Sequence, residues 1–418
     1  MKIRIHRGTK EIGGTCIEVE SQGKRIVLDI GLPLDAPEDE ESQKNLLPEV
    51  SGFEKQDDSL LGALISHSHI DHYGLASKIK NKNIPVWIGE GAHNIMRAAV
   101  PYVPNGFAFD APNFLKNRQL FDLGPFRITP YLVDHSAFDA YAFLIEADGK
   151  SVFYSADFRA HGRKSYLFKN LLANPPSNID VLLMEGTTIG RLKTMKGFKS
   201  EQELEEEFYQ AFNKTEGLHF VWTSTQNIDR IVTIFKAAKR AKRLLIIDLY
   251  LAEVLKATGH EKIPQSDWCE VKVYIPQLQR VFIKKNKLFS NRDQHKKYRI
   301  YPQKLIELSK KSVMIFRPRS MHDKGIINSL DGAALTYSMW EGYLKQDSSQ
   351  KVLDWLRKNN IPQDIIHTSG HASVVDLKKF AEAVNPNRLV PIHTFEPEKY
   401  SEHFNNVEYQ QDGQWWDV

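Results

Sequence analysis

Residues 66–72 (Ser-His-Ser-His-Ile-Asp-His) hold four side chains that can bind metal: His67, His69, Asp71 and His72. Burying three imidazoles and a carboxylate together would cost on the order of several kcal/mol unless metal ions paired with them. His-x-His on an extended segment points both rings to one side, and the following turn brings Asp71 and His72 to a neighbouring point. The cluster therefore predicts two metal ions. Imidazole and carboxylate ligands favour zinc, with manganese or iron as alternatives.

This His-x-His-x-Asp-His pattern resembles the signature of the metallo-β-lactamase superfamily, and the rest of the superfamily pattern follows in order. Asp29, at the end of an apolar run, resembles the aspartate that orients the histidine loop from behind the ligands. His135 resembles the third-motif ligand, and Asp157 resembles the carboxylate that bridges both metals. The resemblance implies an αββα sandwich.

Three further residues narrow the resemblance to the β-CASP nucleases of this superfamily, and within them to the ribonuclease J group. Glu185 in Met-Glu-Gly-Thr resembles motif A, His371 in Ser-Gly-His-Ala resembles motif B, and His393 in Pro-Ile-His-Thr resembles motif C. A histidine in motif C accompanies RNA enzymes of the family, so the resemblance implies RNA as substrate. Residues 223–230 and 337–343 also look like segments of β-CASP proteins.

The resemblance also implies a mechanism. One metal would be held by His67, His69 and His135, the other by Asp71, His72 and His393, with Asp157 between them. Two zinc ions would lower the pKa of a shared water to about 7, so that hydroxide attacks a phosphodiester. Asp71 would orient the nucleophile. His371 would protonate the leaving oxygen, with Glu185 setting its protonation state.

Candidate phosphate contacts are weaker signals. Helix N-termini offer free N–H groups, which makes Thr225 and Asn227, with Arg230 in the same segment, candidates for nucleic-acid contact together with Ser369 and Gly370. Thr and Ser at such places are also ordinary helix caps. The basic segments 236–243 and 284–299 are candidates for tracking an RNA backbone. We expect the remaining histidines, His93, His219, His260 and His295 among them, to lie on the surface.

Short strands and helices must position the metal cluster. The segments that alternate like strands in the first third are 2–6, 15–20, 24–29, 61–66, 85–89, 126–133, 140–147 and 151–155. Helical patterns at 74–80 and 92–100 lie between them, which predicts a layered α/β architecture. From about residue 190 the pattern becomes a parallel α/β module with helices at 201–212 and 227–242 and strands at 218–223 and 244–248. Strands at 365–368 and 389–392 and a helix at 373–384 return to the earlier pattern.

We therefore predict a metallo-β-lactamase domain in two parts, residues 1–189 and 355–418, with a β-CASP domain inserted at 190–354. The inserted part holds 30 Lys and Arg against 19 Asp and Glu, a net charge of +11, whereas the whole chain of 418 residues carries only +4. A basic module inside an acidic frame indicates a polyanionic partner, although chance clustering on a solvated surface is the simpler alternative.

The composition excludes several classes of protein. The sequence contains no run of 18 apolar residues, so no membrane span is predicted. The first residues lack the apolar stretch of a signal peptide. Two distant cysteines form no disulfide framework and no Cys-x-x-Cys metal site, which suits a reducing cytoplasm. Ribonuclease J proteins usually continue into a further domain beyond the point that corresponds to the end of this sequence. The resemblance therefore does not imply processive action, and it leaves open whether the protein forms a homodimer.

Three functions remain from this reasoning. The leading one is a zinc-dependent ribonuclease that acts as an exo- and/or endonuclease on single-stranded RNA. The alternatives are a DNA nuclease of repair or anti-phage defence and a small-molecule metallo-hydrolase. A non-catalytic binding subunit is disfavoured because every ligand position of the family pattern is filled.

Overall fold

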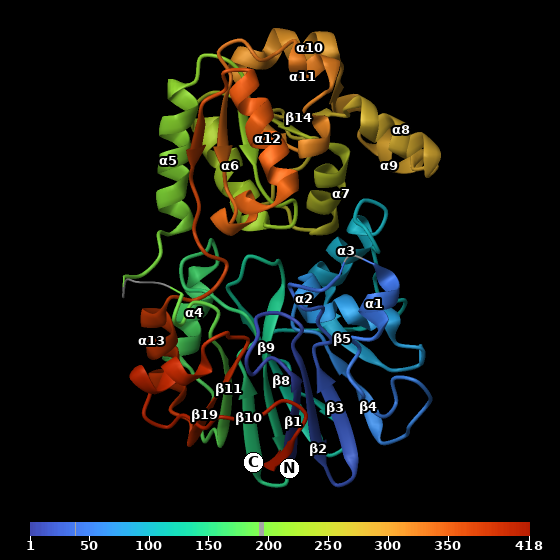
Figure 1. The fold of residues 1–418 in the computed structure, drawn as a ribbon, viewed down its shortest axis with the longest axis vertical. Coiled ribbons are helices and arrows are strands. Elements are labelled where there is room, and N and C mark those ends of the chain that lie inside the picture. Colours follow the sequence, from blue (N-terminus) through green and yellow to red (C-terminus); the bar gives the residue numbers. More distant parts are fainter. Residues whose placement is uncertain (38, 192–195) are drawn as a thin grey trace. The chain divides into compact units, whose positions relative to one another are not determined.

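The computed structural model describes residues 1–37, 39–191 and 196–418. The chain forms two compact units, shown as a ribbon in Figure 1. The first unit comprises residues 1–97, 107–198 and 370–418, and the second comprises residues 98–106 and 199–369. Each unit has its own sheets and core. Among the described residues, no helix is long and apolar enough to cross a membrane.

The first unit is built on two facing sheets. The first sheet has the order β20-β1-β2-β3-β4-β5-β6. Its strands are β1 (Lys2–Arg7), β2 (Cys16–Ser21), β3 (Lys24–Leu28), β4 (Leu60–Leu64), β5 (Val86–Gly89), β6 (Asn113–Leu115) and β20 (Trp415–Asp417). The second sheet has the order β19-β11-β10-β9-β8-β7. Its strands are β7 (Phe121–Leu123), β8 (Phe126–Val133), β9 (Ala140–Ala147), β10 (Lys150–Tyr154), β11 (Val181–Glu185) and β19 (Arg388–Ile392).

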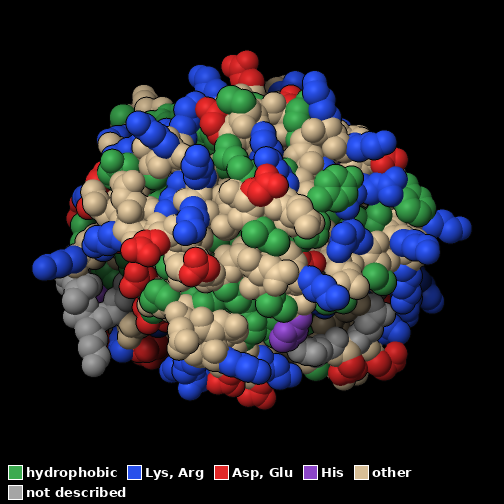
Figure 2. All heavy atoms as spheres, turned by 90° about the horizontal axis from the view of Figure 1, so that it is seen from above, with side chains coloured by type: hydrophobic (Ala, Val, Ile, Leu, Met, Phe, Trp, Pro, Cys, Tyr) green, Lys and Arg blue, Asp and Glu red, His purple; other side chains and the backbone are tan. Residues whose placement is uncertain are grey.

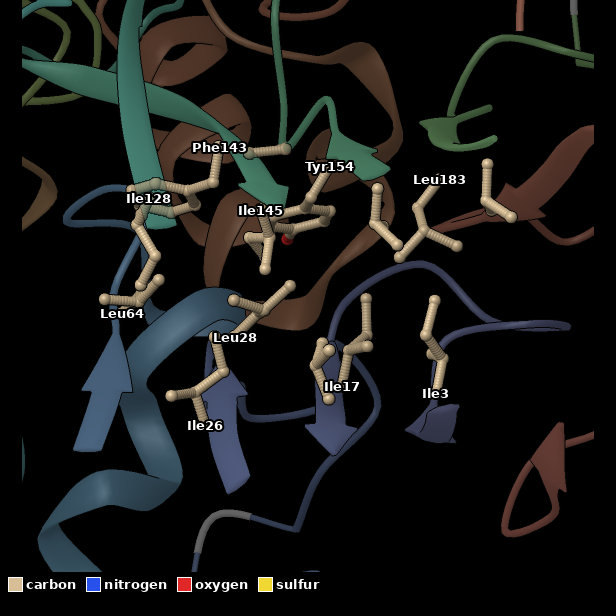
Figure 3. Close-up of a cluster of buried hydrophobic side chains, with 14 of the residues drawn as sticks. Ile3, Ile17, Ile26, Leu28, Leu64, Ile128, Phe143, Ile145, Tyr154 and Leu183 are labelled. Carbon is tan, nitrogen blue, oxygen red and sulfur yellow. The ribbon is translucent and has the colours of Figure 1, made fainter. Parts of the chain in front are cut away.

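Apolar side chains from both sheets meet in one buried core between them (Figure 3). The first sheet contributes Ile3, Ile17, Ile26, Leu28 and Leu64, and the second contributes Ile128, Phe143, Ile145, Tyr154 and Leu183. The alternation of these residues along each strand follows from the two-residue repeat of a strand, which places every second side chain on one face. Burial of this face holds the two sheets together.

Helices cover the outer face of each sheet. Behind the first sheet lie α1 (Glu40–Lys44), α2 (Ile70–Tyr73), the 3₁₀ turn η1 (Gly74–Lys78) and α3 (Glu90–Ala99), with a core of their own. Behind the second sheet lie α4 (Ser165–Ala173), α13 (Val374–Val384) and the turn η6 (Pro397–Glu402). The first unit is therefore an αββα sandwich, and the predicted fold class is confirmed.

The second unit surrounds a seven-stranded sheet in which every pair is parallel, with the order β15-β14-β13-β16-β12-β17-β18. Its strands are β12 (His219–Trp222), β13 (Leu244–Ile247), β14 (Val271–Tyr274), β15 (Arg299–Ile300), β16 (Ser312–Phe316), β17 (Ala334–Tyr337) and β18 (Gln363–Ile365). Its α-helices are α5 (Glu201–Lys214), α6 (Ile228–Arg240), α7 (Leu249–Ala257), α8 (Gln277–Lys285), α9 (Phe289–Gln294), α10 (Pro302–Leu308), α11 (Lys324–Ile327) and α12 (Asp347–Lys358). Four 3₁₀ turns lie among these elements in the described part of this unit: η2 (Lys296–Tyr298), η3 (Ser309–Lys311), η4 (Pro318–Ser320) and η5 (Glu341–Lys345).

The structure corrects the predicted return of the chain to the first domain. Residues 355–369 belong to the second unit, because α12 runs through residue 355 and β18 pairs with β17 of the parallel sheet. The first domain resumes at Gly370 rather than at residue 355. The predicted strand at 365–368 is likewise displaced to Gln363–Ile365. Residue 190 belongs to the first unit, and the second begins at Lys199.

Candidate metal centre

Strand ends deliver the candidate ligands to one edge of the first unit. His67 and His69 follow β4, and α2 carries Asp71 and His72. His135, Asp157 and His393 follow β8, β10 and β19, and Glu185 ends β11. The strands β10, β11 and β19 run parallel, and β8 shares their direction because both β8 and β10 lie antiparallel to β9. Their carboxyl ends therefore meet at one edge, although the residues lie far apart in sequence.

Backbone hydrogen bonds hold α2 at this edge. The N–H groups of Ile30 and Leu32 donate to the carbonyl oxygens of His72 and Ile70 at 2.8 and 3.1 Å. Between them, Gly31 passes so close that an added Cβ would lie 1.8 Å from the carbonyl oxygen of Asp71. Only glycine allows this approach, and through it the segment after β3 sets the position of the Asp71 and His72 side chains.

The potential ligand atoms form three groups, each with all its atoms within 4.8 Å of one another. The groups are His67, His69 and His135; Asp71, His72, Asp157 and His393; and Asp157, Glu185 and His371. Oδ2 of Asp157 lies 3.1 Å from Nε2 of His72, 3.8 Å from Nε2 of His393 and 3.9 Å from Nε2 of His67. Asp157 thus belongs to the second and third groups, and its Oδ2 also lies beside one ring of the first group, close enough to contribute to either metal site.

Unsatisfied polar atoms show that these residues fit metal ions. Nε2 of His67, Nδ1 of His135, Oδ1 of Asp157 and Nε2 of His393 are buried and have no hydrogen-bond partner among the residues that the structure describes. Each such buried group costs about 1–3 kcal/mol when it stays unpaired. Four of them converging in one cluster are best explained as lone pairs directed at cations.

The surroundings of most of these imidazoles lower their pKa and so favour the neutral form that binds metal. Burial lowers the pKa of His67, His69, His135 and His393, and neighbouring histidines lower those of His67 and His135 further. These rings are therefore neutral at pH 7, as a metal ligand must be. His72 differs: burial alone would lower its pKa, but Asp157, Asp29 and Asp71 together raise it well above the ordinary value. A metal ion must displace the proton that this ring carries.

His371 sits between two buried carboxylates. Its Nδ1 lies 3.5 Å from Oε2 of Glu185 and 3.6 Å from Oδ2 of Asp157. Burial lowers the pKa of His371, but the carboxylates of Glu185 and Asp157 outweigh burial and raise it to about 9. In the metal-free protein this ring therefore carries a proton at neutral pH.

Glu185 is itself held by backbone donors. Thr187 donates its N–H to Oε2 at 3.1 Å, and Ala372 and Phe158 donate to Oε1 at 3.4 and 3.5 Å. The N–H of Ala372, next to His371, therefore binds the same carboxylate that faces the ring, which fixes the loop after Gly370 against the end of β11.

Asp29 lies behind the cluster and is held by four polar contacts. Its carboxylate accepts the N–H of Ser66 at 2.7 Å, the hydroxyl of Ser66 at 2.7 Å and the hydroxyl of Tyr154 at 2.5 Å, and lies 2.8 Å from Nδ1 of His72. Thr15 plays a similar part for His393, with its hydroxyl 2.9 Å from Nδ1. These contacts turn the Nε2 atoms of both rings toward Asp157.

Ser66, Tyr154 and Thr15 were missed by sequence reasoning. Ser66 adjoins the histidine motif and Tyr154 lies in a predicted strand, so their positions gave a weak signal, whereas nothing local marks Thr15. Backbone conformation is a further sign of the site. Asp29, Ala156 and His393 have φ of 57°, 46° and 50°, a region that residues with side chains seldom adopt and that clusters at functional sites.

The candidate phosphate contacts are divided between the two units. Gly370 lies beside the His135 loop, where an added Cβ would come within 2.8 Å of the Ser136 hydroxyl, and it belongs to the first unit, whereas Ser369 ends the second. Thr225 is buried, and Asn227 caps α6 by accepting the N–H of Arg230 at 3.1 Å.

Arg230 corrects the prediction most clearly. Its side chain is completely buried and its guanidinium pairs with Glu201 at 2.9 Å. It also donates to the carbonyl oxygen of Ser338 at 3.3 Å. The guanidinium therefore stabilises the second unit and is not offered to a nucleic acid.

The expectation that the remaining histidines lie on the surface is also wrong for three of four. His93, His219 and His295 are buried, and only His260 is exposed. Their ring nitrogens reach oxygens of the surrounding chain, which a sequence pattern does not show.

Comparison with known proteins places this geometry in a family. The beta-lactamase superfamily domain matches residues 34–248. Ribonuclease J of Mycoplasma pneumoniae is 22% identical over 94% of this chain and 67% of its own length, and ribonuclease J of Helicobacter pylori is 21% identical over 94% and 56%. An RNase J-like protein of Methanocaldococcus jannaschii is 24% identical over 60% and 55%. The chain thus spans about half to two thirds of the length of these curated relatives.

A solved structure shows the same fold over the whole chain. It is a protein of unknown function from Enterococcus faecalis, with a TM-score of 0.77 and 21% identity over 99% of both chains. At that identity it supports the fold alone. The domain match covers more than half of the chain, and the αββα sandwich and the histidine cluster agree with it. This protein therefore belongs to the metallo-β-lactamase superfamily, with ribonuclease J among its relatives.

Proposed function

We propose that this protein is a metal-dependent nuclease that hydrolyses phosphodiester bonds of single-stranded RNA, in the manner of a ribonuclease J-like exo- and/or endoribonuclease. The observation that carries the proposal is the position of Asp157, which lies in the group of Asp71, His72 and His393, 3.9 Å from Nε2 of His67 and beside His371. RNA is proposed as the substrate because the curated relatives are named ribonuclease J. Cys16 and Cys269 are free thiols, which suits a reducing environment and therefore favours the cytoplasm.

We assign His67, His69 and His135 to one divalent metal and Asp71, His72 and His393 to the other, with Asp157 as a ligand to both. The donor set of imidazoles and carboxylates favours zinc, with manganese as the alternative. When bound, the two ions supply Lewis acidity and lower the pKa of a bound water. The buried ligands keep bulk water away from the site, which strengthens the electrostatic interactions within it.

Side-chain exposure separates groups that can touch a substrate from those that cannot. Asp71 is 15% exposed and His371 is 22% exposed, whereas His72, Asp157, Glu185 and His393 are about 1% exposed. Asp71 therefore can orient an attacking water while its other oxygen binds metal. His371 can reach the phosphate or the leaving oxygen.

His371 is the proposed general acid. Glu185 and Asp157 face its Nδ1, so these carboxylates keep the ring protonated, and Nε2–H is left to donate a proton to the leaving oxygen. Glu185 is then a positioning residue, because it acts through the histidine. Loss of either carboxylate would lower the pKa of His371.

The test compares RNA and DNA of one sequence, with 5′-monophosphate, 5′-triphosphate and 5′-hydroxyl ends, and maps the products over time. Asp71→Ala and His371→Ala should each lower RNA cleavage by about a thousandfold or more, since several kcal/mol of transition-state stabilisation is lost. The control His403→Ala, a histidine of the same unit outside the site, should retain cleavage. A ladder from one end identifies an exonuclease and internal fragments an endonuclease. Cleavage of DNA alone, or full activity of both site variants, would contradict the proposal.

A further inference from the structure

The second unit contains two basic segments, and the charged side chains of the two segments differ in their partners. On α6, Lys239 pairs with Glu270 at 2.7 Å and Arg240 pairs with Glu206 at 2.6 Å. Arg243, just after α6, donates to the carbonyl oxygen of Gly217 at 2.8 Å. These cations are already used within the fold. The segment at 236–243 therefore keeps only Lys236 and Lys242 as exposed cations outside the ion pairs of the described residues.

The second segment, residues 277–301, is named here the basic hairpin and comprises α8, α9, η2 and β15 with Tyr301. It holds eight Lys and Arg and one acidic residue, Asp293, which pairs with Arg292 at 2.6 Å. Five of its lysines are exposed and form no ion pair within 4.0 Å among the residues that the structure describes: Lys284, Lys285, Lys287, Lys296 and Lys297. Figure 2 shows Lys and Arg side chains gathered on its right-hand side, where Figure 1 draws α8 and α9.

The guanidinium groups of the basic hairpin crowd one another. Burial lowers the pKa of Arg299, and nearby Arg280 and Arg292 lower it further. Nε of Arg299 is buried and has no hydrogen-bond partner within the described part of the chain. Repulsion between like charges is relieved when an anion binds near them.

Exposed rings lie among these cations. Phe289 is 41% exposed with the Arg292 guanidinium 5.2 Å from its ring centre, and Tyr301 is 54% exposed with Arg299 4.7 Å from its ring centre. Cations next to stackable aromatic faces are the combination by which proteins bind single-stranded nucleic acid without reading its sequence. A duplex would need the charges but not the rings.

A buried histidine makes the basic hairpin a rigid part of the unit. Nε2 of His295 lies 2.7 Å from Oε1 of Glu253 on α7, and its Nδ1 lies 2.7 Å from the hydroxyl of Ser266. Asn291 of α9 donates to the same Glu253 carboxylate. The inner side of the hairpin is thus fixed to α7, while its lysines face solvent.

We propose that the basic hairpin is a binding surface for single-stranded RNA, made of other residues than the metal centre, and that it acts on the substrate backbone. The lysines would contact phosphates, and Phe289 and Tyr301 would stack on bases. This inference rests on the proposed function for its choice of RNA. It predicts that long RNA binds more tightly than fragments that occupy the metal centre alone.

The test measures binding of fluorescein-labelled oligouridylates of about 24 and about 4 nucleotides to the full chain in a metal chelator, lengths that exceed and fall within one site of this kind. The variant K284Q/K285Q/K287Q should bind the long RNA at least about tenfold more weakly at 0.1 M salt. The slope of log K against log salt should fall by about 2, because each phosphate contact to a single strand contributes about 0.7. Binding of the short RNA, which makes fewer phosphate contacts, should weaken less than binding of the long RNA.

The matched control is K236Q/K351Q/K358Q, which removes three exposed lysines of the same unit from scattered places. It should change binding by less than about twofold, as expected for charges outside the contact surface. Equal losses in the two triple variants would show only a general effect of net charge and would overturn the proposal. Thermal melting of both variants checks that folding is unchanged.

A second variant tests the rings. Phe289→Ala/Tyr301→Ala should weaken binding of the long RNA by about tenfold and leave the salt slope unchanged, since stacking releases no counterions. Unchanged affinity in this variant overturns single-stranded RNA as the ligand. If K284Q/K285Q/K287Q no longer co-sediments with phosphatidylserine vesicles but still binds RNA, the proposed RNA surface is overturned in favour of a membrane surface. Because a chelator blocks cleavage, binding can be read even if the protein proves not to cleave RNA.

Discussion

Both units of this protein bury histidines, but the surroundings of the rings differ. In the second unit the ring nitrogens of His219 lie 2.7 and 2.8 Å from the hydroxyls of Thr215 and Thr336, and those of His295 reach Ser266 and Glu253. In the first unit His67, His135 and His393 each keep one nitrogen without a hydrogen-bond partner among the described residues. Burial is common to both groups. Nδ1 of His93 is also buried without a hydrogen-bond partner among the described residues, so one unsatisfied nitrogen alone does not mark a ligand. The candidate metal ligands are distinguished because several unsatisfied atoms occur together in one cluster of histidines and carboxylates.

The largest expected effect comes from the carboxylate shared by the ligand groups. Asp157→Asn keeps the shape and removes the charge that faces His67, His72 and His393, so cleavage should fall by about a thousandfold or more. Initial rates on labelled RNA measure this loss. Circular dichroism should remain that of the parent protein. Near-normal rates would place the reaction elsewhere in the molecule.

Metal should stabilise the first unit and leave the second unaffected. Zinc at about 1,000 times its dissociation constant should add about 4 kcal/mol to the free energy of unfolding of the parent protein. His67→Ala should lose most of this gain and bind fewer ions by elemental analysis, because a ligand with no other partner is removed. His219→Gln, in contrast, should keep the full metal content. A loss of metal in His219→Gln would contradict the distinction between the two groups.

His295→Ala tests the opposite side of the comparison. The substitution leaves Glu253 and Ser266 buried without their partner, which should destabilise the second unit by about 2–3 kcal/mol. Chemical denaturation followed by tryptophan fluorescence measures the loss. Metal content should be unchanged. An equal loss of bound metal would mean that His295 also supports the metal centre.

Acid should weaken the second unit through His219. Burial, with a smaller contribution from Arg243, lowers the pKa of His219 to about 3, against about 6.5 for an exposed ring. Below pH 6.5 the unfolded chain therefore binds a proton at His219, whereas the folded protein does not. The contribution of His219 to the free energy of unfolding is complete above pH 6.5 and is lost as pH falls toward 3. At pH 5 the loss should be about 2 kcal/mol.

The control for this pH effect is His219→Gln, which removes the titrating ring and keeps a hydrogen-bonding group. The variant should be less stable than the parent at pH 7.5, and its unfolding free energy should change less between pH 7.5 and pH 5. Identical pH dependence in the two proteins would show that another group is responsible.

The smallest predicted effect concerns Thr15. Thr15→Val removes the hydroxyl that lies 2.9 Å from Nδ1 of His393 and keeps the side-chain volume. Zinc affinity should fall by about tenfold, as is typical when a group that orients a metal-binding histidine is lost. Competition with a colorimetric chelator measures the change. Stability without metal should be nearly that of the parent, which separates an orienting role from a structural one.

Much of the fold followed from local patterns. The strands at 126–133 and 140–147 were predicted with their observed ends, because two-residue alternation is a property of the chain itself. The helix at Val374–Val384 was predicted from Ser373, whose hydroxyl accepts the N–H of Asp376 at 3.2 Å. The prediction that the chain returns to the first domain at residue 355 was wrong. Pairing of β18 with β17 joins segments far apart in sequence, and strand pairing carries no local signal.

The candidate site divides in the same way. Amino-acid types and order alone determined that His67, His69, Asp71 and His72 should act together, because six neighbouring residues cannot place so many ligands apart. Only the tertiary structure brought Asp157, Glu185 and His371 to that point, since their meeting depends on which strand ends share an edge. It also decided that Arg230, a plausible phosphate ligand by type, is a buried partner of Glu201. A side chain's chemistry is written in the sequence, but whether its charge is free or already paired is set by residues that fold against it.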